Sequence, residues 1–282
     1  MNTTEVSATT TVAAVIGDPI RHSVSPALHN AAFRATGLDW VFVAFEVASG
    51  GASAALDAMR SLALGGLSVT MPHKHDVAQA CDELTDDAAR LASVNCVVRR
   101  ADGSLLGDST DGEGFVRALR DAGHDPAGES VLLLGAGGAA RAVAVALGRA
   151  GCRVHVAARR AAAARDAAAL VAGGVTVEWD ERHDAVAAAT LVVNATPIGM
   201  GGEGESPLRP DVLGPRHVVA DLVYHPLLTP LLRSATERGS AGVDGLGMLV
   251  HQAALAFERW TATPAPVAVM TAAARAAVAS RP

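Results

Sequence analysis

The sequence contains very little lysine, tyrosine and cysteine. Lys74 is the only lysine among 23 Lys and Arg residues, and Tyr224 is the only tyrosine. The three cysteines, Cys81, Cys96 and Cys152, are odd in number and widely spaced. This pattern fits neither a disulfide framework nor a zinc site. We therefore expect reduced thiols and a cytoplasmic location.

Long basic runs and long apolar runs are also missing. The formal net charge is −6, and this acidic balance argues against a nucleic-acid partner. The uncharged stretch 185–202 is interrupted by Thr, Asn, Pro and Gly, so it does not predict a membrane span. The N-terminal segment MNTTEVSATTTV lacks the basic and apolar regions of an export signal. What remains is a chain of 282 residues, 50% hydrophobic, which suits one large or two medium globular domains.

Short β-type runs alternate with helical patterns along the chain. In the first part we expect strands at 11–17, 40–47, 65–70 and within 94–108, and helices at about 26–36, 52–64, 72–80 and 82–91. From residue 112 the pattern becomes regular βαβ, with strands in SVLLLG, CRVHVAAR, VTVEWD, TLVVNAT and HVVADLVY, and the segment 246–279 is helical. The pattern predicts an α/β protein whose second part forms a parallel, doubly wound sheet.

The strongest single motif is GAGGAA at 135–140, between a predicted buried strand and a predicted helix. Glycines at this spacing permit a tight turn and let the backbone approach a pyrophosphate that faces helix N–H groups. After the next strand, Arg159 and Arg160 stand where NAD-binding proteins usually carry an acidic residue for the ribose 2′-hydroxyl. Two guanidinium groups favour a 2′-phosphate, so the sequence predicts NADP(H).

The lone lysine lies in a segment suited to proton transfer. In SVTMPHK, Thr70 ends a predicted strand and Lys74 lies in the first turn of the next helix. The positive end of the helix macrodipole disfavours a charged amine there. That position is poor for stability, but it suits an amine that must exchange a proton. His73 and His75 flank the lysine. Further metal ligands that would match this histidine pair are not evident elsewhere in the sequence, so a metal site is not predicted.

Two further segments carry polar groups at predicted helix starts. Ser23 and Ser25 are two residues apart, so in extended backbone their hydroxyls would project to one side. Ser25 followed by Pro26 is also typical of a helix N-cap with a first-turn proline. In GDSTDGEG, Thr110 or Asp111 is either an N-cap or a functional group. An aspartate that meets the lone lysine would complete the proton-handling pair that alcohol oxidation requires.

Taken in order, these segments resemble the shikimate dehydrogenase family. The matching stretches span nearly the whole chain: GDPIRHSVSPALHNAAF, SVTMPHK, SVNCVV, GDSTDGEG, GAGGAARA, NATPIGM, DLVYHPLLTPLL and DGLGMLVHQAALAFERW. The resemblance implies an N-terminal α/β substrate domain with a mixed sheet, residues 1–111, completed by helices in 246–282. It also implies a Rossmann-like, parallel-sheet NADP-binding domain, residues 112–245, with a cleft between the two. The implied activity is reversible reduction of 3-dehydroshikimate to shikimate by NADPH, in chorismate and aromatic amino acid biosynthesis, by a monomer or a homodimer.

The same resemblance implies a role for individual residues. Lys74 would be the catalytic acid/base, paired with Asp111. Substrate contacts are implied for Ser23, Ser25, Thr70, Asn95, Thr110, Tyr224 and Gln252. Cofactor contacts are implied for Gly135, Ala136, Gly137, Gly138, Ala139, Arg159, Arg160, Thr196, Leu222, Gly245 and Asp86, with Met200 as a further candidate. No metal is expected.

The sequence departs from the family pattern at a few positions and leaves alternatives open. The usual Asn-Arg-Thr after the second strand of the dinucleotide-binding part is Ala-Arg-Arg at 158–160, Ser109 replaces a common Asn, and Cys96 replaces a common Thr. A quinate/shikimate or aminoshikimate-type dehydrogenase is one alternative. A non-catalytic dinucleotide-binding sensor is another, although a sensor would need neither Lys74 nor Asp111.

Overall fold

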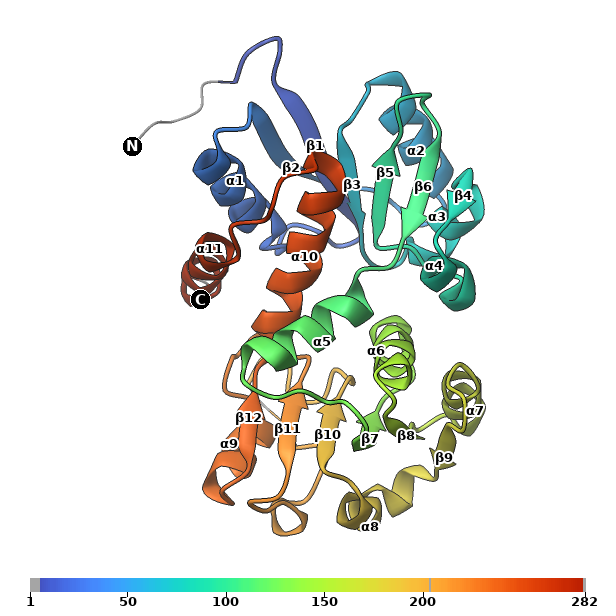
Figure 1. The fold of residues 1–282 in the computed structure, drawn as a ribbon, viewed down its shortest axis with the longest axis vertical. Coiled ribbons are helices and arrows are strands. Elements are labelled where there is room, and N and C mark those ends of the chain that lie inside the picture. Colours follow the sequence, from blue (N-terminus) through green and yellow to red (C-terminus); the bar gives the residue numbers. More distant parts are fainter. Residues whose placement is uncertain (1–5, 203, 281–282) are drawn as a thin grey trace. The chain divides into compact units, whose positions relative to one another are not determined.

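The computed structural model describes residues 6–202 and 204–280, which divide into two compact units (Figure 1). Unit 1 comprises the described residues up to Thr110 and those from Val250 onward, and unit 2 comprises the described part of Asp111–Leu249. Each unit has its own sheet and its own core. Within the described ranges, no helix has both the length and the apolar character needed to cross a bilayer.

Unit 1 is built on a mixed six-stranded sheet in the order β2-β1-β3-β5-β6-β4. Its strands are β1 (Thr11–Gly17), β2 (Trp40–Glu46), β3 (Gly66–Val69), β4 (Glu83–Leu84), β5 (Cys96–Arg99) and β6 (Leu105–Asp108). β1, β2 and β3 are parallel, whereas β5 is antiparallel to both β3 and β6. The C-terminal ends of β1, β3 and β6 therefore lie at the same edge of the sheet as the N-terminal end of β5.

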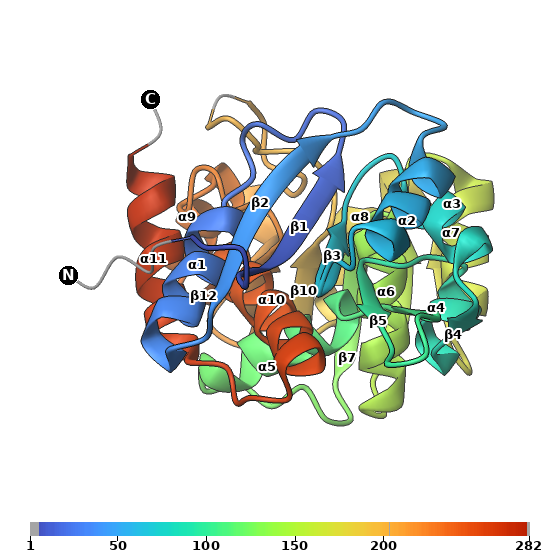
Figure 2. The same ribbon diagram turned by 90° about the horizontal axis from the view of Figure 1, so that it is seen from above.

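The helices of unit 1 come from both ends of the chain. They are α1 (Ser25–Thr36), α2 (Ala52–Ser61), α3 (Lys74–Ala80), α4 (Asp86–Leu91), the part of α10 (Gly245–Thr261) from Val250 onward, and α11 (Val267–Ala279). Helix α11 packs against α1, next to the outermost strand β2 (Figure 2). Residues more than 200 positions apart in the sequence thus share one core.

A tryptophan on α10 fixes this helix on the sheet of unit 1. The indole of Trp260 approaches Gly66 of β3 so closely that a Cβ at Gly66 would collide with the ring. The indole Nε1 donates a 3.0 Å hydrogen bond to the Val97 carbonyl of β5. Gly66 is therefore required as glycine by the close packing of a side chain, since any larger residue would displace α10.

Unit 2 is built on a wholly parallel six-stranded sheet in the order β12-β11-β10-β7-β8-β9. Its strands are β7 (Ser130–Leu134), β8 (Arg153–Ala157), β9 (Val175–Val177), β10 (Leu191–Asn194), β11 (Val218–Asp221) and β12 (Ala241–Val243). Its helices are α5 (Asp111–Asp121), α6 (Gly138–Arg149), α7 (Ala161–Ala169), α8 (Arg182–Ala185), α9 (Pro230–Glu237) and the first turn of α10, with 3₁₀ turns at Trp179–Glu181, Val186–Ala188 and Pro210–Val212. The strand order reverses between β7 and β10, which is where ligands bind in doubly wound folds.

Both faces of the parallel sheet are buried. Along β7, Val131 and Leu133 belong to one apolar cluster, whereas Leu132 and Leu134 belong to another. Alternate side chains of a strand point to opposite faces, so this strand is apolar throughout and is covered on both sides. The predicted α/β architecture and the doubly wound second part are confirmed.

Two of the predicted helix boundaries were wrong. The segment 82–91 is not one helix, because Glu83–Leu84 forms β4, which pairs with β6, and only Asp86–Leu91 is helical. Thr85 ends the strand and caps α4, where its hydroxyl accepts a hydrogen bond from the Ala88 amide. The pairing of β4 depends on β6, which local sequence patterns do not reveal. Helix α3 begins at Lys74 rather than at residue 72, after a turn.

Candidate active site

Most of the polar residues that the sequence singled out for substrate and catalysis belong to unit 1, at the sheet edge defined above. Ser23 and Ser25 follow β1, Thr70 and Lys74 follow β3, Asn95 precedes β5, Thr110 follows β6, and Gln252 lies on α10. Because the corresponding strand ends meet at one edge, the topology of the mixed sheet brings these segments together. This sheet edge of unit 1 is therefore the candidate substrate site.

Asn95 is the centre of a hydrogen-bond network at this edge. Its buried side-chain Nδ2 donates to Thr110 Oγ1 (2.9 Å) and to Gln252 Oε1 (3.3 Å), and its Oδ1 accepts from the Thr110 amide (2.7 Å). Its carbonyl accepts from the Val69 amide (2.8 Å), and its own amide donates to the Asp108 carbonyl (3.0 Å). One asparagine thus ties β3, β6 and α10 together.

Lys74 is held next to this network through its backbone. Its carbonyl accepts a 2.9 Å hydrogen bond from the amide of Val94, the residue before Asn95. The preceding His73 is completely buried, and its Nε2 donates to the Val47 carbonyl (2.7 Å). The half-buried lysine is the first residue of α3, so it lies in the first turn as predicted, and the turn before it is anchored.

Thr70 packs directly against the end of β1. Its amide donates to the Ile16 carbonyl (3.0 Å), and a Cβ at Gly17 would come within 2.5 Å of Thr70 Cγ2. Gly17 is thus a position where only glycine allows two segments of the site to approach.

The backbone around Ser23 and Ser25 differs from the prediction in two ways. Val24 has helical dihedral angles (φ −90°, ψ −6°), so the segment is a turn and not extended. Val24 is also the N-cap position, and Ser25 is the first residue of α1, so the predicted N-cap role of Ser25 was wrong, whereas Pro26 lies in the first turn as expected. The two serines remain adjacent, since the Ser25 amide donates to Ser23 Oγ (3.3 Å).

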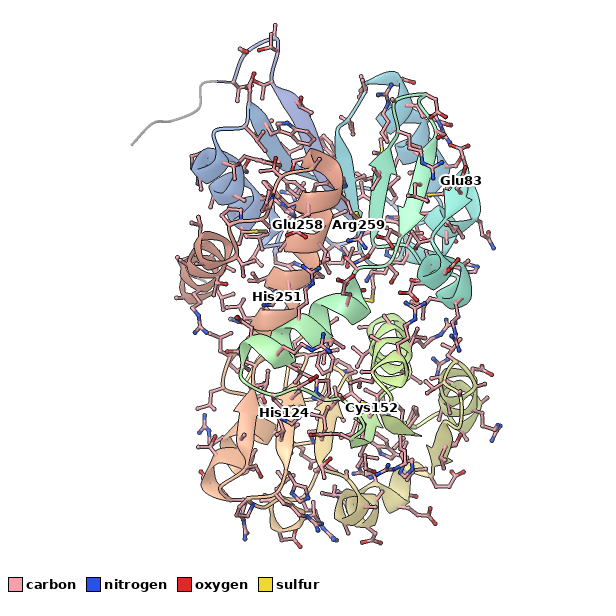
Figure 3. All side chains as sticks on the ribbon, viewed as in Figure 1. Glu83, His124, Cys152, His251, Glu258 and Arg259 are labelled. Atoms are coloured by element: carbon pink, nitrogen blue, oxygen red, sulfur yellow. The ribbon has the colours of Figure 1, made fainter. Side chains whose placement is uncertain are left out.

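An ion pair between a buried aspartate and a partly exposed arginine supports the segment that leads to Thr110. Asp108, at the end of β6, is 3% exposed, and its Oδ1 accepts from Thr85 Oγ1 (2.7 Å) and from the Ser109 amide (2.8 Å). Its Oδ2 is paired with the guanidinium of Arg259, which projects from α10 (Figure 3). The sequence analysis missed this pair. Its one sequence signal is an arginine beside Glu258 in a C-terminal helix that is mostly apolar.

Three of the sequence-predicted residues belong to a different unit from the groups with which they were expected to act. Asp111, the buried first residue of α5, and Tyr224, after β11, belong to unit 2. Asp111 follows Thr110 directly, so the chain itself keeps it one residue from the Asn95 network. Asp86, expected at the cofactor, is the exposed first residue of α4 in unit 1.

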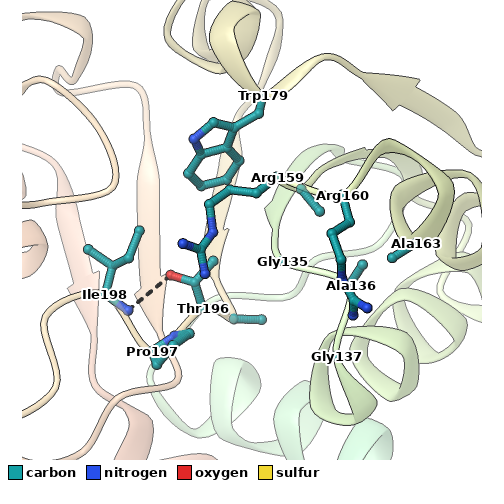
Figure 4. Close-up of a pocket in the computed structure, with 12 residues that line it drawn as sticks. Gly135, Ala136, Gly137, Arg159, Arg160, Ala163, Trp179, Thr196, Pro197 and Ile198 are labelled. Carbon is teal, nitrogen blue, oxygen red and sulfur yellow. Dashed lines mark hydrogen bonds between the residues drawn. The ribbon is translucent and has the colours of Figure 1, made fainter.

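Unit 2 contains a cavity of about 500 Å³ at the C-terminal ends of its central strands (Figure 4). Its walls combine the glycine-rich turn after β7, the arginines after β8 and the segment after β10. They are formed by Gly135, Ala136, Gly137, Ala158, Arg159, Arg160, Ala163, Trp179, Ala195, Thr196, Pro197 and Ile198. The cavity therefore lies beside the reversal point between β7 and β10, where a dinucleotide is expected.

The glycine-rich turn fits a pyrophosphate. Gly135 has φ +112°, and a Cβ there would come within 2.7 Å of the Ala195 carbonyl oxygen, so this position needs glycine. At Gly137 and Gly138 an added Cβ would meet nothing within 4 Å, so the turn is open on that side. No side chain caps the start of α6, which begins at Gly138. Its first N–H groups can therefore bind an anion.

The charge of the cavity also fits a phosphate-rich ligand. Arg159 and Arg160 are exposed, and in Figure 4 the guanidinium of Arg159 extends toward Thr196, whereas that of Arg160 extends toward Gly137. Among the described residues that line the cavity, none is acidic. Two cations and open backbone N–H groups are the donor set that an NADP phosphate requires.

A buried carboxylate supports the loop after β10. Asp221, 1% exposed at the end of β11, accepts hydrogen bonds from Asn194 Nδ2 (2.9 Å), the Val223 amide (3.0 Å) and Thr229 Oγ1 (2.7 Å). Burial raises the pKa of Asp221 above its ordinary value. Asn194 Oδ1 in turn accepts from Thr196 Oγ1 (2.7 Å), so the network fixes a side chain that lines the cavity.

The remaining cofactor predictions lie in unit 2 but outside the cavity wall. Gly245 begins α10, and a Cβ there would collide with the Leu222 carbonyl, so these two residues are neighbours. Gly138 and Ala139 form the start of α6, and Met200 is 61% exposed in the loop after β10. Over residues 6–202 and 204–280, no three His, Cys, Asp or Glu side chains are grouped as a metal site.

Six residues of the cavity wall were not among those predicted for the cofactor: Ala158, Ala163, Trp179, Ala195, Pro197 and Ile198. Trp179 begins the 3₁₀ turn after β9 and lines the same cavity as the two arginines. The available signal was a tryptophan, a rare residue in this chain, directly after the third strand of a dinucleotide-binding βαβ unit.

Comparison with known proteins identifies relatives over nearly the whole chain. Residues 15–97 match the family model of the shikimate dehydrogenase substrate binding domain, and residues 245–275 match that of the shikimate 5′-dehydrogenase C-terminal domain. The NADP(+) shikimate dehydrogenase of Moorella thermoacetica is 45% identical over 94% of this chain and 93% of its own, and that of Methanopyrus kandleri is 44% identical over 94% and 95%.

Solved structures agree with these relatives. The shikimate 5-dehydrogenase of Thermus thermophilus, in complex with NADP(H) and shikimate, is 36% identical, covers 95% of this chain and 99% of its own, and superposes with a TM-score of 0.88. The quinate dehydrogenase of Corynebacterium glutamicum in complex with NAD, 33% identical, covers 94% and 98% with a TM-score of 0.89. On the combined evidence of sequence, fold and glycine-rich cavity, the chain belongs to the shikimate dehydrogenase family.

Proposed function

We propose that this protein is an NADP-dependent oxidoreductase that catalyses the reversible reduction of 3-dehydroshikimate to shikimate in the cytoplasm. The observation that carries the proposal is the position of the single lysine. Its backbone is hydrogen-bonded to Val94, beside the Asn95 network of amide and hydroxyl groups. A polyol substrate needs such neutral hydrogen-bonding groups, and its oxidation needs a group that exchanges a proton.

Unit 1 is proposed to bind the substrate. Ser23 and Ser25, at the start of α1, would bind the carboxylate, helped by the positive end of the helix. Thr70 and the Asn95 network, with Thr110 and Gln252, would bind the ring hydroxyls, as would Tyr224 of unit 2. A site built to hydrogen-bond each hydroxyl strongly rejects analogues that lack one, because its polar groups are then left unpaired.

Lys74 and Asp111 are proposed to manage the proton. NADPH, when bound, supplies the hydride that is added to the carbonyl carbon. Protonated Lys74 stabilises the negative charge that develops on the carbonyl oxygen and donates its proton to that oxygen. In the oxidative direction the neutral amine takes the proton from the substrate hydroxyl. Asp111 would hold the amine in position for both directions.

Unit 2 is proposed to bind the dinucleotide. The turn at Gly135–Ala139 would hold the pyrophosphate, and Arg159 and Arg160 would hold the 2′-phosphate. Thr196 and Leu222 would lie along the nicotinamide half, together with Gly245. The fixed position of Thr196 in the Asp221–Asn194 network supports this assignment.

A quinate-type dehydrogenase is the second candidate, because the quinate dehydrogenase named above shares the fold at 33% identity. Steady-state assays of shikimate and quinate, each with NADP⁺ and NAD⁺, separate the candidates. We expect kcat/KM for shikimate with NADP⁺ to exceed each other combination by about tenfold or more, the worth of one charge-assisted hydrogen bond. Preference for quinate or for NAD⁺ would contradict the proposal, and tight NADPH binding without turnover would indicate a sensor.

A further inference from the structure

We propose that the indole of Trp179 is the surface on which the adenine ring of the dinucleotide stacks. This inference rests on the proposed NADP(H) function, because it names the part of the cavity that binds the end of the cofactor remote from the reacting atoms. It is carried by the register of two neighbouring strands, by the packing around the indole, and by the covalent structure of NADP(H).

The register of β8 and β9 places Trp179 beside the arginines. Ala157 of β8 is paired with Val177 of β9 in parallel orientation. Arg159 lies two residues after Ala157, and Trp179 lies two residues after Val177. The two segments therefore leave the sheet at the same edge and at equivalent positions. Both side chains line the cavity, and Figure 4 shows the indole on the Arg159 side of it, away from Gly137.

The indole is held in a fixed orientation from outside the cavity. The guanidinium carbon of Arg182 lies 4.3 Å from the centre of the Trp179 ring, which is a cation–π contact. The same guanidinium donates to the Trp179 carbonyl (2.7 Å) and to the Pro207 carbonyl (2.8 Å). Arg182 thus fixes both the ring and its backbone, and the residue held in this way lines the cavity. A ring held in this way loses little conformational entropy when a ligand stacks on it.

The chemistry of the cofactor places adenine at this wall. In NADP(H) the adenine is bonded to the ribose carbon next to the one that bears the 2′-phosphate. A 2′-phosphate held by Arg159 and Arg160 therefore brings a flat aromatic base within a few ångströms of those arginines. Ala158 and Ala163, the small residues of the same wall, leave room for it. Of the residues lining the cavity, Trp179 offers the large aromatic face that stacks on a base.

Binding of adenosine 2′,5′-bisphosphate tests the proposal directly, because this probe carries the base and the 2′-phosphate but no nicotinamide. Calorimetric titration of the Trp179→Leu protein should show an affinity roughly 10- to 100-fold below that of the unmodified protein, the range expected for loss of one base–aromatic stack. Trp179→Phe, which keeps a flat ring, should restore most of the loss. Val175→Ala, a change to a half-exposed residue at the other end of β9, is the matched control and should leave the affinity unchanged.

Fluorescence gives a second readout that a purely structural role would not move. Trp179 belongs to unit 2, whereas Trp40 and Trp260 belong to unit 1. Stacking quenches an indole at contact range, so the probe should quench the unmodified protein and the Trp40→Phe protein alike. The quenching should disappear in Trp179→Phe, which remains informative even if Trp179→Leu fails to fold. Unchanged probe affinity in a folded Trp179→Leu protein, or quenching that persists in Trp179→Phe, would overturn the proposal.

The two proposals fail in different ways. Absence of shikimate-dependent NADP⁺ reduction by the unmodified protein would reject the proposed function, whereas the binding and quenching measurements need no substrate. In the active enzyme, Trp179→Leu should raise the KM for NADPH and for NADH by similar factors, because both carry adenine. A rise confined to NADPH would show instead that the variant disturbs the arginines, and it would contradict adenine stacking.

Discussion

The candidate ligand-binding groups of the two units differ in how firmly the protein holds them before a ligand binds. In unit 1, Thr110 and Gln252 are both hydrogen-bonded to Asn95, so the positions of the three side chains are set before a substrate arrives. In unit 2, the candidate ligand groups are backbone N–H groups of a glycine turn and the exposed guanidinium groups of Arg159 and Arg160. The first arrangement discriminates among neutral hydroxyls by geometry, and the second attracts phosphate charge from a distance.

Two buried ionisable groups, His29 in unit 1 and Asp221 in unit 2, respond to burial in opposite ways. His29 of unit 1 is completely buried, stacks on Phe42 at 4.3 Å between ring centres, and has no hydrogen-bond partner at either ring nitrogen in the described structure. Burial lowers its pKa to about 3. In unit 2, burial raises the pKa of Asp221. Protonation therefore opposes folding at His29 and favours folding at Asp221, so acid acts in opposite directions at these two groups.

The largest expected effect separates the chemistry of unit 1 from the binding of unit 2. Lys74→Ala should lower turnover by about 10²–10⁴-fold, because general acid–base catalysis is lost, while NADPH affinity measured by titration should hold. Lys74→Arg should also be poorly active, since a guanidinium keeps the charge but does not release a proton. Near-normal turnover of the Arg variant would reduce Lys74 to an electrostatic anchor.

The next effect concerns the stability of unit 1. Arg259→Met leaves the Asp108 carboxylate buried without its cation and should lower the free energy of unfolding in urea by about 3 kcal/mol. The double change Asp108→Asn with Arg259→Met should recover part of the loss, because no buried charge then remains. Arg233→Met, at an exposed position of α9, is the matched control, and we expect a change within about 0.5 kcal/mol. Equal losses in the two methionine variants would show that the ion pair adds nothing.

A smaller effect tests the charge of unit 2. Changing both Arg159 and Arg160 to Gln should raise the KM for NADPH by roughly 30-fold, equivalent to about 2 kcal/mol of charge-assisted hydrogen bonding. The KM for NADH should change little, because it has no 2′-phosphate, and the NADPH effect should shrink at high salt. A parallel rise for both cofactors would show that the arginines act on a shared part of the dinucleotide.

The smallest effect is the change in the free energy of unfolding produced by one pH unit. Between pH 6.5 and about 3 the unfolded state binds a proton at His29 that the folded state does not, so stability should fall as the pH falls, by about 1.4 kcal/mol per pH unit. His29→Phe should remove this contribution, as measured by urea unfolding at a series of pH values. Asp221→Asn should act in the opposite sense, because ionisation of Asp221 lowers stability as the pH rises through its raised pKa. An unchanged slope in the His29 variant would contradict this account.

Local signals sufficed for the parallel sheet and for the glycine-rich turn. Strand β7, the turn at Gly135–Gly137 and helix α6 are consecutive in sequence, so each is visible in its own residues. Lys74 could likewise be singled out, because its rarity and its place at a helix start are properties of the sequence alone.

The rest depends on contacts between distant segments. Asn95 and Gln252 are 157 residues apart, and only the resemblance to a family named them as site residues. The Asp108–Arg259 pair and the short strand β4 each depend on a neighbour that no local pattern specifies. Trp179 needed the register between β8 and β9, which sets which residues leave the sheet together.

The close packing of Trp260 on Gly66 has a consequence for biosynthesis of the protein. The indole donates to a carbonyl 163 residues earlier in the sequence, and all of the unit 2 sequence lies between the two residues. During translation, unit 2 is therefore complete before the last helices of unit 1 have emerged from the ribosome. Until then, one apolar face of the N-terminal sheet stays exposed to solvent. We expect chaperones to bind the nascent chain mainly during this interval.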